Sequence, residues 1–201
     1  MGTKADIIEA IVDLELEMFL SVPSDGESPC QQHPDGFKFH RRMQFSVWSE
    51  ATLASYRQGL MVARKNDENL MTIKYARMQG LLPCRNANPL IDEIVRIKMA
   101  WQSEMIRRHP AIMGSARPIS QSGSGDPMTS FETYARCELE TYSDDTLTSL
   151  YADMRAMLDR GINASEEIYR LQAEKSGFGS LEAAEVYLQE KNNAKENRNE
   201  K

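Results

Sequence analysis

Apolar residues recur at spacings of three and four along almost the whole chain, which is the period of an α-helix with one buried face. No segment alternates apolar and polar residues in the manner of a half-buried strand. The pattern predicts an all-α fold, a single-domain orthogonal or irregular bundle of about seven to eight helices. A chain of 201 residues can bury a substantial core in one domain, expected at residues 1–191. The polar residues 192–201 are expected to form a disordered tail.

Turn residues and helix caps divide this pattern into segments. The stretch VPSDGESPC predicts a loop after a first helix at residues 4–21. Thr129 and Glu132 have the spacing of a capping box, so we expect a helix over residues 129–142, and Asn163 with Glu166 predicts a later helix start. Residues 109–128 are rich in Gly, Ser and Pro, which fits either a flexible surface loop or an ordered binding loop.

Charge, hydropathy and cysteine content exclude several classes of protein. A net charge of -6 and a pI near 5.2 argue against a broad basic face, so we expect no nucleic-acid binding. No apolar run reaches the roughly 18 residues of a membrane-spanning helix, and acidic residues interrupt the apolar N-terminal stretch. Cys30, Cys84 and Cys137 are odd in number and far apart, which predicts free thiols and a cytoplasmic protein. Self-association into a homo-oligomer is left open.

Several polar residues fall on the apolar faces of their predicted helices. At about 100° per residue, Glu15 lies within the arc that Ile8, Ile11 and Phe19 form on the first helix. Helices expected at residues 37–48, 70–81, 89–108 and 129–142 carry further polar residues on or beside their apolar arcs: Arg41, Gln44, Lys74, Arg77, Lys98 and Glu138. An ionised group is costly in an apolar interior unless it has a partner, so these groups must pair with one another or bind a ligand.

Two interpretations of the inward charges stay open. In the first, the cations outnumber Glu15 and Glu138, and the surplus binds a small anionic metabolite, a carboxylate or a phosphate, in a buried pocket. The expected ligand-binding residues are Arg41, Gln44, Lys74, Tyr75, Arg77 and Tyr142. If the protein is an enzyme, Glu15 or Glu138, with a pKa raised by burial, is the candidate general acid or base. In the second, the charges form an internal salt-bridge network of a structural or protein-interaction domain.

A second alternative uses Cys30 and the nearby histidines. Cys30 precedes a predicted helix start and lies near His33 and His40 in the sequence, so it is a further catalytic candidate in a thiol- or metal-dependent enzyme. The spacing contains no CxxC, HExxH or Glu-x-x-His unit, so no metal site is predicted. The sequence also lacks a phosphate-binding loop and a dinucleotide fingerprint, so no cofactor is predicted.

Several strings occur in an order that resembles a known family: LELEMF, CQ, FKFHRRMQFSVW, SY, NLMTIKYARM, RP (Arg117 and Pro118), TSFETYARCELETYS and GFGSLEAAE. They resemble the bacterial domain-of-unknown-function family 4125, over about Ile7 to Glu185. The resemblance implies family motif positions at Glu15, Cys30, Gln31, Arg41, Gln44, Trp48, Lys74, Tyr75, Arg77, Glu132, Glu138 and Tyr142. Gly59 and Lys98 depart from the family pattern, which implies Asp and Gln there. Some relatives are fused to a nucleotidyltransferase-like domain, which implies small-molecule or nucleotide metabolism.

Overall fold

The regular elements of the protein are all helical in the residues that the computed structural model describes, 2–23, 31–120 and 129–199. The first half of the chain forms α1 (Lys4–Leu20), α2 (Pro34–Ser46), α3 (Glu50–Lys65), α4 (Leu70–Met78) and α5 (Leu90–Arg108). The second half forms the 3-10 helix η1 (Ile112–Ser115), then α6 (Phe131–Leu139), α7 (Asp144–Asp159), α8 (Ala164–Lys175) and α9 (Leu181–Asn199). The all-α class is confirmed, with nine α-helices in these ranges instead of seven or eight.

Polar caps determine where several helices begin. Asn163 caps α8, as predicted, because its side chain accepts hydrogen bonds from the backbone N–H groups of the first turn, including that of Glu166. The start of α6 differs from the prediction. Ser130, not Thr129, is the capping residue, and its hydroxyl accepts a hydrogen bond from the backbone N–H of Thr133. The helix therefore begins one residue after Ser130 and ends at Leu139.

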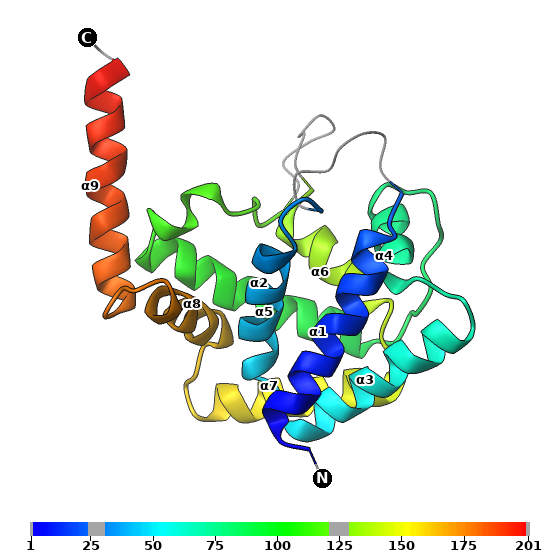
Figure 1. The fold of residues 1–201 in the computed structure, drawn as a ribbon. Helices are drawn as coiled ribbons and strands as arrows, with labels where there is room; N and C mark the ends of the chain where they lie inside the picture. Colours follow the sequence, from blue (N-terminus) through cyan, green and yellow to red (C-terminus); the bar gives the residue numbers. More distant parts are fainter. Residues whose placement is uncertain (1, 24–30, 121–128, 200–201) are drawn as a thin grey trace.

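The helices that carry the inward charges are neighbours in space. In Figure 1, α1 crosses the front of the molecule between α2 and α3 and packs against both, and also against α4. Behind it, α5 packs against α6, α7 and α8, and α4 packs against α6. Side chains from α1, α2, α4, α5 and α6 can therefore meet in one part of the interior.

Two apolar cores hold the helices together. The main core is formed by side chains from all seven helices α1 to α7, and its completely buried members include Ile11, Phe45, Leu53, Leu139 and Leu147. Burial of each large side chain contributes about 1.5–3 kcal/mol relative to exposure. A smaller second core joins the end of α5 and η1 to α8 and α9 through Met105, Met113, Ala173, Leu181 and Ala184.

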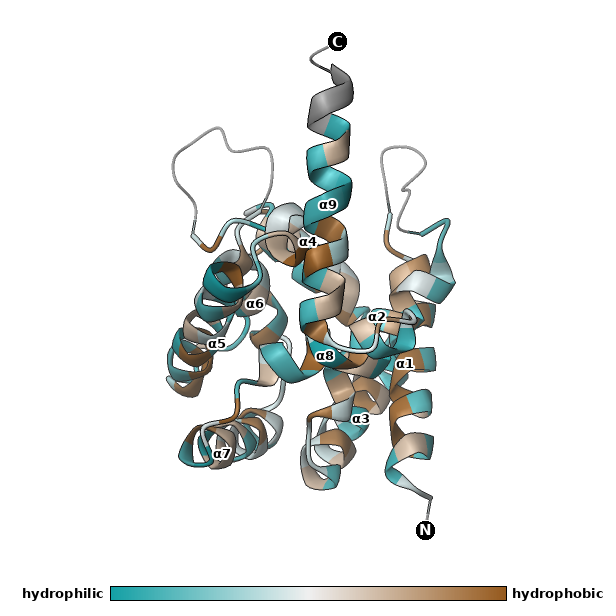
Figure 2. Cartoon of the chain, turned by 90° about the vertical axis from the view of Figure 1, so that its left-hand side faces the viewer, coloured by the Kyte–Doolittle hydropathy of each residue, from teal (hydrophilic) through white to brown (hydrophobic). Residues whose placement is uncertain are grey.

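The last helix, α9, packs by its first turns and then extends away from the body, where Figure 2 shows mostly hydrophilic residues. Glu185 anchors the first turns of α9 to the body. Its two carboxylate oxygens accept hydrogen bonds from the backbone N–H groups of Ala111 and Ile112, each at 2.8 Å. The sequence predicts a helix end near Lys191, but α9 continues to Asn199. Lys, Glu, Ala and Arg in this segment favour a helix, so part of the expected tail is helical. Residues 200 and 201 lie outside the described ranges.

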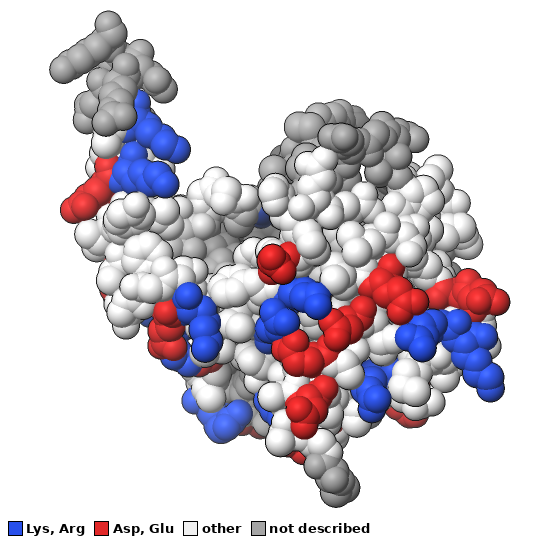
Figure 3. All heavy atoms as spheres, viewed as in Figure 1, with Lys and Arg blue, Asp and Glu red and all other residues white. Residues whose placement is uncertain are grey.

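The surface charges are mixed on the face that Figure 3 shows. Lys and Arg side chains lie next to Asp and Glu side chains on this face. The ion pairs Lys38–Asp13 and Arg42–Glu9 join the exposed sides of α1 and α2. This face therefore presents no broad basic surface. None of the helices in the described ranges is both long and apolar enough to cross a membrane.

Candidate functional site

Four charged side chains meet in the interior: Glu15, Arg41, Lys74 and Glu138, which we call the charged cluster. Their exposed fractions are 0%, 5%, 2% and 4% respectively, so solvent barely reaches them. They come from α1, α2, α4 and α6, and each lies on the helix face that also carries buried apolar residues. The helical period places a charge in the core at these positions, and tertiary packing then brings the four charges together.

Arg41 is the centre of the charged cluster. Its Nε donates to Oε2 of Glu15 at 2.6 Å, and its Nη2 donates to Oε1 of the same carboxylate, which makes a two-pronged ion pair. Its Nη1 donates to Oε1 of Glu138 at 2.9 Å and to Oε1 of Gln44 at 2.6 Å. The guanidinium carbon also lies 4.7 Å from the centre of the Phe45 ring. Arg41 thus bridges both buried carboxylates.

Tyr56 is a further hydrogen-bond donor to the carboxylate of Glu15. Its hydroxyl donates to Oε1 of Glu15 at 2.6 Å, and the ring lies in the main core on α3. Burial raises the pKa of Tyr56 well above its usual range, and the charge of Glu15 raises it further. Tyr56 therefore remains a neutral donor across the ordinary pH range. It adds a hydrogen bond to the most deeply buried carboxylate without adding charge.

Lys74 connects the charged cluster to α6. Its Nζ donates to the hydroxyl oxygen of Tyr134 at 2.8 Å and lies 3.4 Å from Oε1 of Glu138. Tyr134 and Glu138 are one turn apart on α6, so they face the same lysine. The ammonium also lies 4.1 Å from the centre of the Tyr134 ring and 5.1 Å from that of Tyr75.

The ion pairs fix the protonation states of Lys74 and Glu138. Burial alone would raise the pKa of Glu138, but the positive charges of Lys74, Arg41 and Lys98 outweigh it and hold that pKa well below its usual range. For Lys74, burial acts to lower the pKa, but Tyr134 and Glu138 raise it above the usual lysine value. The expectation of a raised carboxyl pKa is therefore wrong for Glu138, because pairing outweighs desolvation. Glu138 stays ionised and is poorly suited to donate a proton.

Two further cations lie at the edge of the charged cluster. Lys98 on α5 is half-buried and feels the charges of Glu138, Arg41 and Lys74, yet its ammonium makes no hydrogen bond or ion pair within the described ranges. Arg117 lies after η1, and its guanidinium carbon is 4.8 Å from the centre of the Tyr134 ring. Its hydrogen bond goes to the backbone oxygen of Thr129, and no described carboxylate pairs with it. Neither Lys98 nor Arg117 therefore has a matching anion among the described residues.

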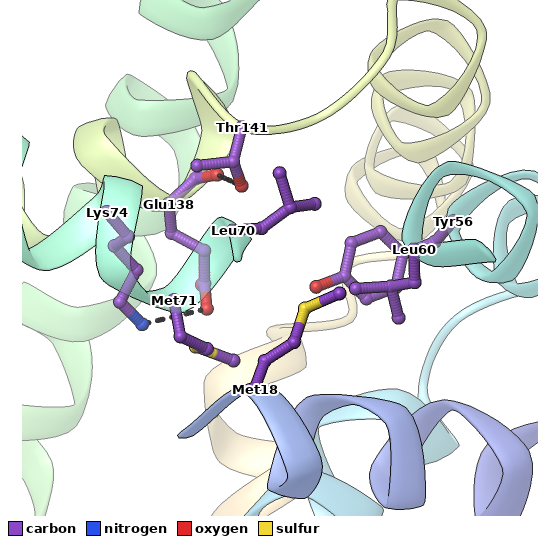
Figure 4. A pocket seen from close by; sticks show the side chains of 8 residues that line it. All are labelled: Met18, Tyr56, Leu60, Leu70, Met71, Lys74, Glu138 and Thr141. Carbon is purple, nitrogen blue, oxygen red and sulfur yellow. Dashed lines mark hydrogen bonds and ion pairs between the residues drawn. The ribbon is translucent and has the colours of Figure 1, made fainter. Parts of the chain in front are cut away.

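A small cavity adjoins Lys74 and Glu138, and most of the side chains that line it are apolar (Figure 4). Its volume is ≈ 10 Å³, and its wall is made by Met18, Tyr56, Leu60, Leu70, Met71, Lys74, Glu138 and Thr141. A space of this size accommodates about one water molecule. A metabolite does not fit in this cavity.

The predicted binding residues do not all join the charged cluster. Gln44 accepts from Arg41, and the ring of Tyr75 lies near Lys74. Arg77 lies apart, because its Nε donates to Oε2 of Glu140 at 2.8 Å near the end of α6.

Tyr142 is buried beside Tyr56, with 4.7 Å between the ring centres. Its hydroxyl has no hydrogen-bond partner in the described structure. Burial and the charge of Glu138 raise its pKa well above the usual range, so it remains a neutral potential donor.

The cysteine and histidine candidates are separate from this cluster. Cys30 lies outside the described residues. His33 and His40 are both exposed, and Nδ1 of His40 lies 3.2 Å from the side-chain nitrogen of Gln172 on α8. The described ranges contain no group of three or more His, Cys, Asp or Glu side chains that could hold a metal ion.

Some residues at the site carry a weak sequence signal. The helical period marks Tyr56 as a core aromatic but does not show that its hydroxyl meets Glu15. Arg117 lies in an irregular segment, where no helical wheel gives a direction to its side chain. Glu140 follows the last residue of α6, so its direction depends on how that helix ends. Only the Arg-Pro string at Arg117, within the family resemblance, points to this position.

The fold and the site define an all-helical protein whose interior holds a hydrogen-bonded cluster of ion pairs. The chain belongs to the family described as "Protein of unknown function (DUF4125)", whose model matches residues 5–186 of the 201. A search of curated proteins and a search of solved structures each gave no match. The match includes every residue of the charged cluster, and also Lys98 and Arg117.

Proposed function

We propose that the protein binds a small anionic metabolite, a carboxylate or a phosphate, at the edge of the charged cluster. The observation that carries this proposal is an imbalance of charge. Among the described residues, three cations, Arg41, Lys74 and Lys98, face the two carboxylates of Glu15 and Glu138, and Lys98 has no direct partner there. Arg117 adds a further guanidinium, with which no carboxylate of the described residues pairs.

The physical reason lies in the energy of partly buried cations. Removing a cation from water is unfavourable unless an anion or hydrogen-bond acceptors replace the water. Arg117 suits such a ligand, because its planar guanidinium can donate two parallel hydrogen bonds to a carboxylate or a phosphate. In this arrangement Glu15 and Glu138 orient the cations instead of binding the ligand. The cavity near Lys74 has room for about one water molecule, so the proposed ligand binds outside this cavity, at the edge of the cluster.

One observation favours the alternative of a structural or protein-interaction domain. Arg41 already has four side-chain hydrogen bonds, to both oxygens of Glu15, to Glu138 and to Gln44. Such a satisfied guanidinium offers little to a ligand, and the cluster would then serve only to fix how the helices pack. The two functions differ in what the edge cations do, because only a ligand site needs Lys98 and Arg117.

We also propose a reducing, cytoplasmic location. Cys84 and Cys137 are free thiols in the structure, and Cys84 is exposed. An exposed free thiol is stable as such in a reducing compartment. Fractionation of source cells, with thiol labelling of Cys84 before lysis, tests this location. Labelling of the reduced thiol in the cytoplasmic fraction supports it, and recovery of the protein outside the cytoplasm contradicts it.

Thermal unfolding with a ligand panel tests the anion site. The panel contains phosphate, glycerol phosphate, pyruvate, lactate and succinate, with glycerol and acetamide as uncharged comparisons. A ligand at 100 times its Kd stabilises the protein by about 2.7 kcal/mol, which corresponds to a rise of roughly 5–11 °C in Tm for a chain of this size. Arg117→Gln and Lys98→Gln should lose most of the rise. Arg96→Gln, which changes an exposed residue on α5, should keep it. A panel without any anion-dependent rise contradicts the proposal.

A further inference from the structure

A groove of ≈ 590 Å³ lies between α3 and α7, and neither Lys98 nor Arg117 lines it. In Figure 1, α7 lies behind α3, and the two helices pack against each other. Ser55 and Val62 on α3 both line the groove, so it follows this helix for about two turns, or about 10 Å. Small-molecule sites have volumes of about 300–1,000 Å³. The groove, unlike the cavity near Lys74, is therefore large enough for a small metabolite.

Gly59 keeps the middle of this groove open. It lies within α3, although glycine destabilises the interior of a helix relative to alanine. Its backbone does not have the positive φ that favours glycine, and a Cβ at this position would meet no atom within 4 Å. Neither the local backbone nor close packing therefore requires a glycine here. The missing side chain instead adds to the space of the groove, which Gly59 lines.

Three polar side chains that line the groove have free hydrogen-bonding groups. They are Gln58 on α3 and Asp145 and Ser149 on α7, and within the described ranges none of these side chains makes a hydrogen bond or an ion pair. Asp145 and Ser149 are four residues apart, so they lie on one face of α7. The carboxylate accepts hydrogen bonds, while the amide and the hydroxyl both donate and accept them. Both walls of the groove thus offer polar groups to a single bound molecule.

The charges of the groove disfavour an anion. Arg85 lines the groove, but its guanidinium already donates to both carboxylate oxygens of Glu68, each at 2.9 Å. Asp145 adds a carboxylate with which no described cation pairs. A purely apolar ligand is also disfavoured, because it would cover these polar groups without replacing their hydrogen bonds to water. The groove therefore suits an uncharged molecule with several hydroxyl groups.

We infer that this groove binds a small neutral saccharide, a mono- or disaccharide. A sugar hydroxyl both donates and accepts hydrogen bonds, so one sugar can match the carboxylate of Asp145, the amide of Gln58 and the hydroxyl of Ser149. Its C–H groups pack on the apolar side chains of Val62 and Leu70, which also line the groove. The inference goes beyond the proposed anion site and is independent of it, because that site uses other residues.

Saturation-transfer difference NMR tests this inference on the full-length protein. The probes are glucose, galactose, mannose, N-acetylglucosamine, maltose and trehalose, each at millimolar concentration. We expect transfer to at least one of these sugars, and calorimetry then gives its Kd. Gly59→Gln places a side chain in the groove and should abolish the transfer. The matched control is Gly36→Gln, because Gly36 is also a helical glycine with open space around its Cβ, but it lies on α2 and does not line the groove.

The choice of Gly59→Gln guards against loss of the fold. Glutamine is a better helix former than glycine, so thermal unfolding should show a Tm no lower than that of the wild type. Ser149→Ala is a second variant that leaves the groove open. It should raise the Kd of the sugar about two- to twelvefold, the effect of losing one hydrogen bond.

Each result supports or overturns the inference. Sugar binding that Gly59→Gln abolishes and Gly36→Gln retains supports it. Absence of transfer to all six sugars overturns it, and so does equal transfer in the wild type and in Gly59→Gln, which would come from another surface. Putrescine is run in parallel as a cationic probe. Binding of putrescine without any sugar, lost in Asp145→Asn, also overturns the inference, because the groove would then be a site for a cation.

Discussion

Replacement of Arg41 by methionine is the perturbation whose energy the structure defines best. The substitution removes four hydrogen bonds at once and leaves Glu15 and Glu138 buried. Among the described residues, Glu15 then retains the hydrogen bond from Tyr56 at 2.6 Å, and Glu138 retains the ion pair with Nζ of Lys74 at 3.4 Å. Methionine fills much of the volume of the arginine stem, so the main loss is electrostatic and not steric.

The expected loss is about 4 kcal/mol of unfolding free energy, because removing one member of a buried ion pair costs about 3–5 kcal/mol. For a chain of this length, about 1 kcal/mol corresponds to roughly 2–4 °C, so Tm should fall by roughly 8–16 °C. Most of the loss comes from the carboxylates that are left without a cation. A double variant, Arg41→Met with Glu15→Gln, should therefore be more stable than Arg41→Met alone.

Urea unfolding at neutral pH, followed by circular dichroism, measures these differences. Arg42→Met is a matched control on the same helix, because Arg42 makes an equally short two-pronged pair with Glu9, at 2.6 and 2.7 Å, but at the surface. A surface ion pair contributes about 0–1 kcal/mol, so this variant should stay close to the wild type. Equal effects at Arg41 and Arg42 would refute the claim that burial gives the inner pair its energy.

Three further predictions concern other charged groups. Glu138→Gln should lose less stability than the wild type between about pH 5 and pH 3, because the lowered pKa of Glu138 contributes to acid destabilisation only in the wild type; acid titration followed by circular dichroism measures this. Lys98→Met should raise Tm at pH 7, and the gain should shrink as the pH rises toward about 10.4, because the pKa of Lys98 is lowered only in the folded state. Glu185→Ala should increase hydrogen exchange in α9 and at Ala111 and Ile112, as mass spectrometry can detect, while α1 stays protected.

The fold class could be predicted because helices leave local signals. The period of the apolar residues and the cap at Asn163 act within a few residues, and both agree with the structure. The start of α6 could not be fixed in this way, since Thr129 and Ser130 are both suitable caps and tertiary contacts decide between them. The sequence also could not predict where α9 ends, because the last residues of this helix are mostly polar and no apolar stripe shows how far the helix continues.

The charged cluster could be predicted in part for the same reason. Glu15, Arg41, Lys74 and Glu138 each lie on the apolar side of a helix, which the sequence shows, and burial then requires partners. The pairing itself is a matter of distance between helices, which periodicity does not contain. Arg77 illustrates this limit, because it is one turn from Lys74 on α4 but pairs with a different buried carboxylate, that of Glu140 just after α6.

The proposed anion site can be tested most directly by diffraction from crystals soaked in bromide or selenate, whose anomalous scattering locates a bound anion without ambiguity. We predict a peak within hydrogen-bond distance of Lys98 or Arg117, and its loss in the Arg117→Gln, Lys98→Gln double variant. Anomalous peaks confined to other surfaces, with Lys98 and Arg117 bare of any anion, would contradict the proposal that these cations form a ligand site.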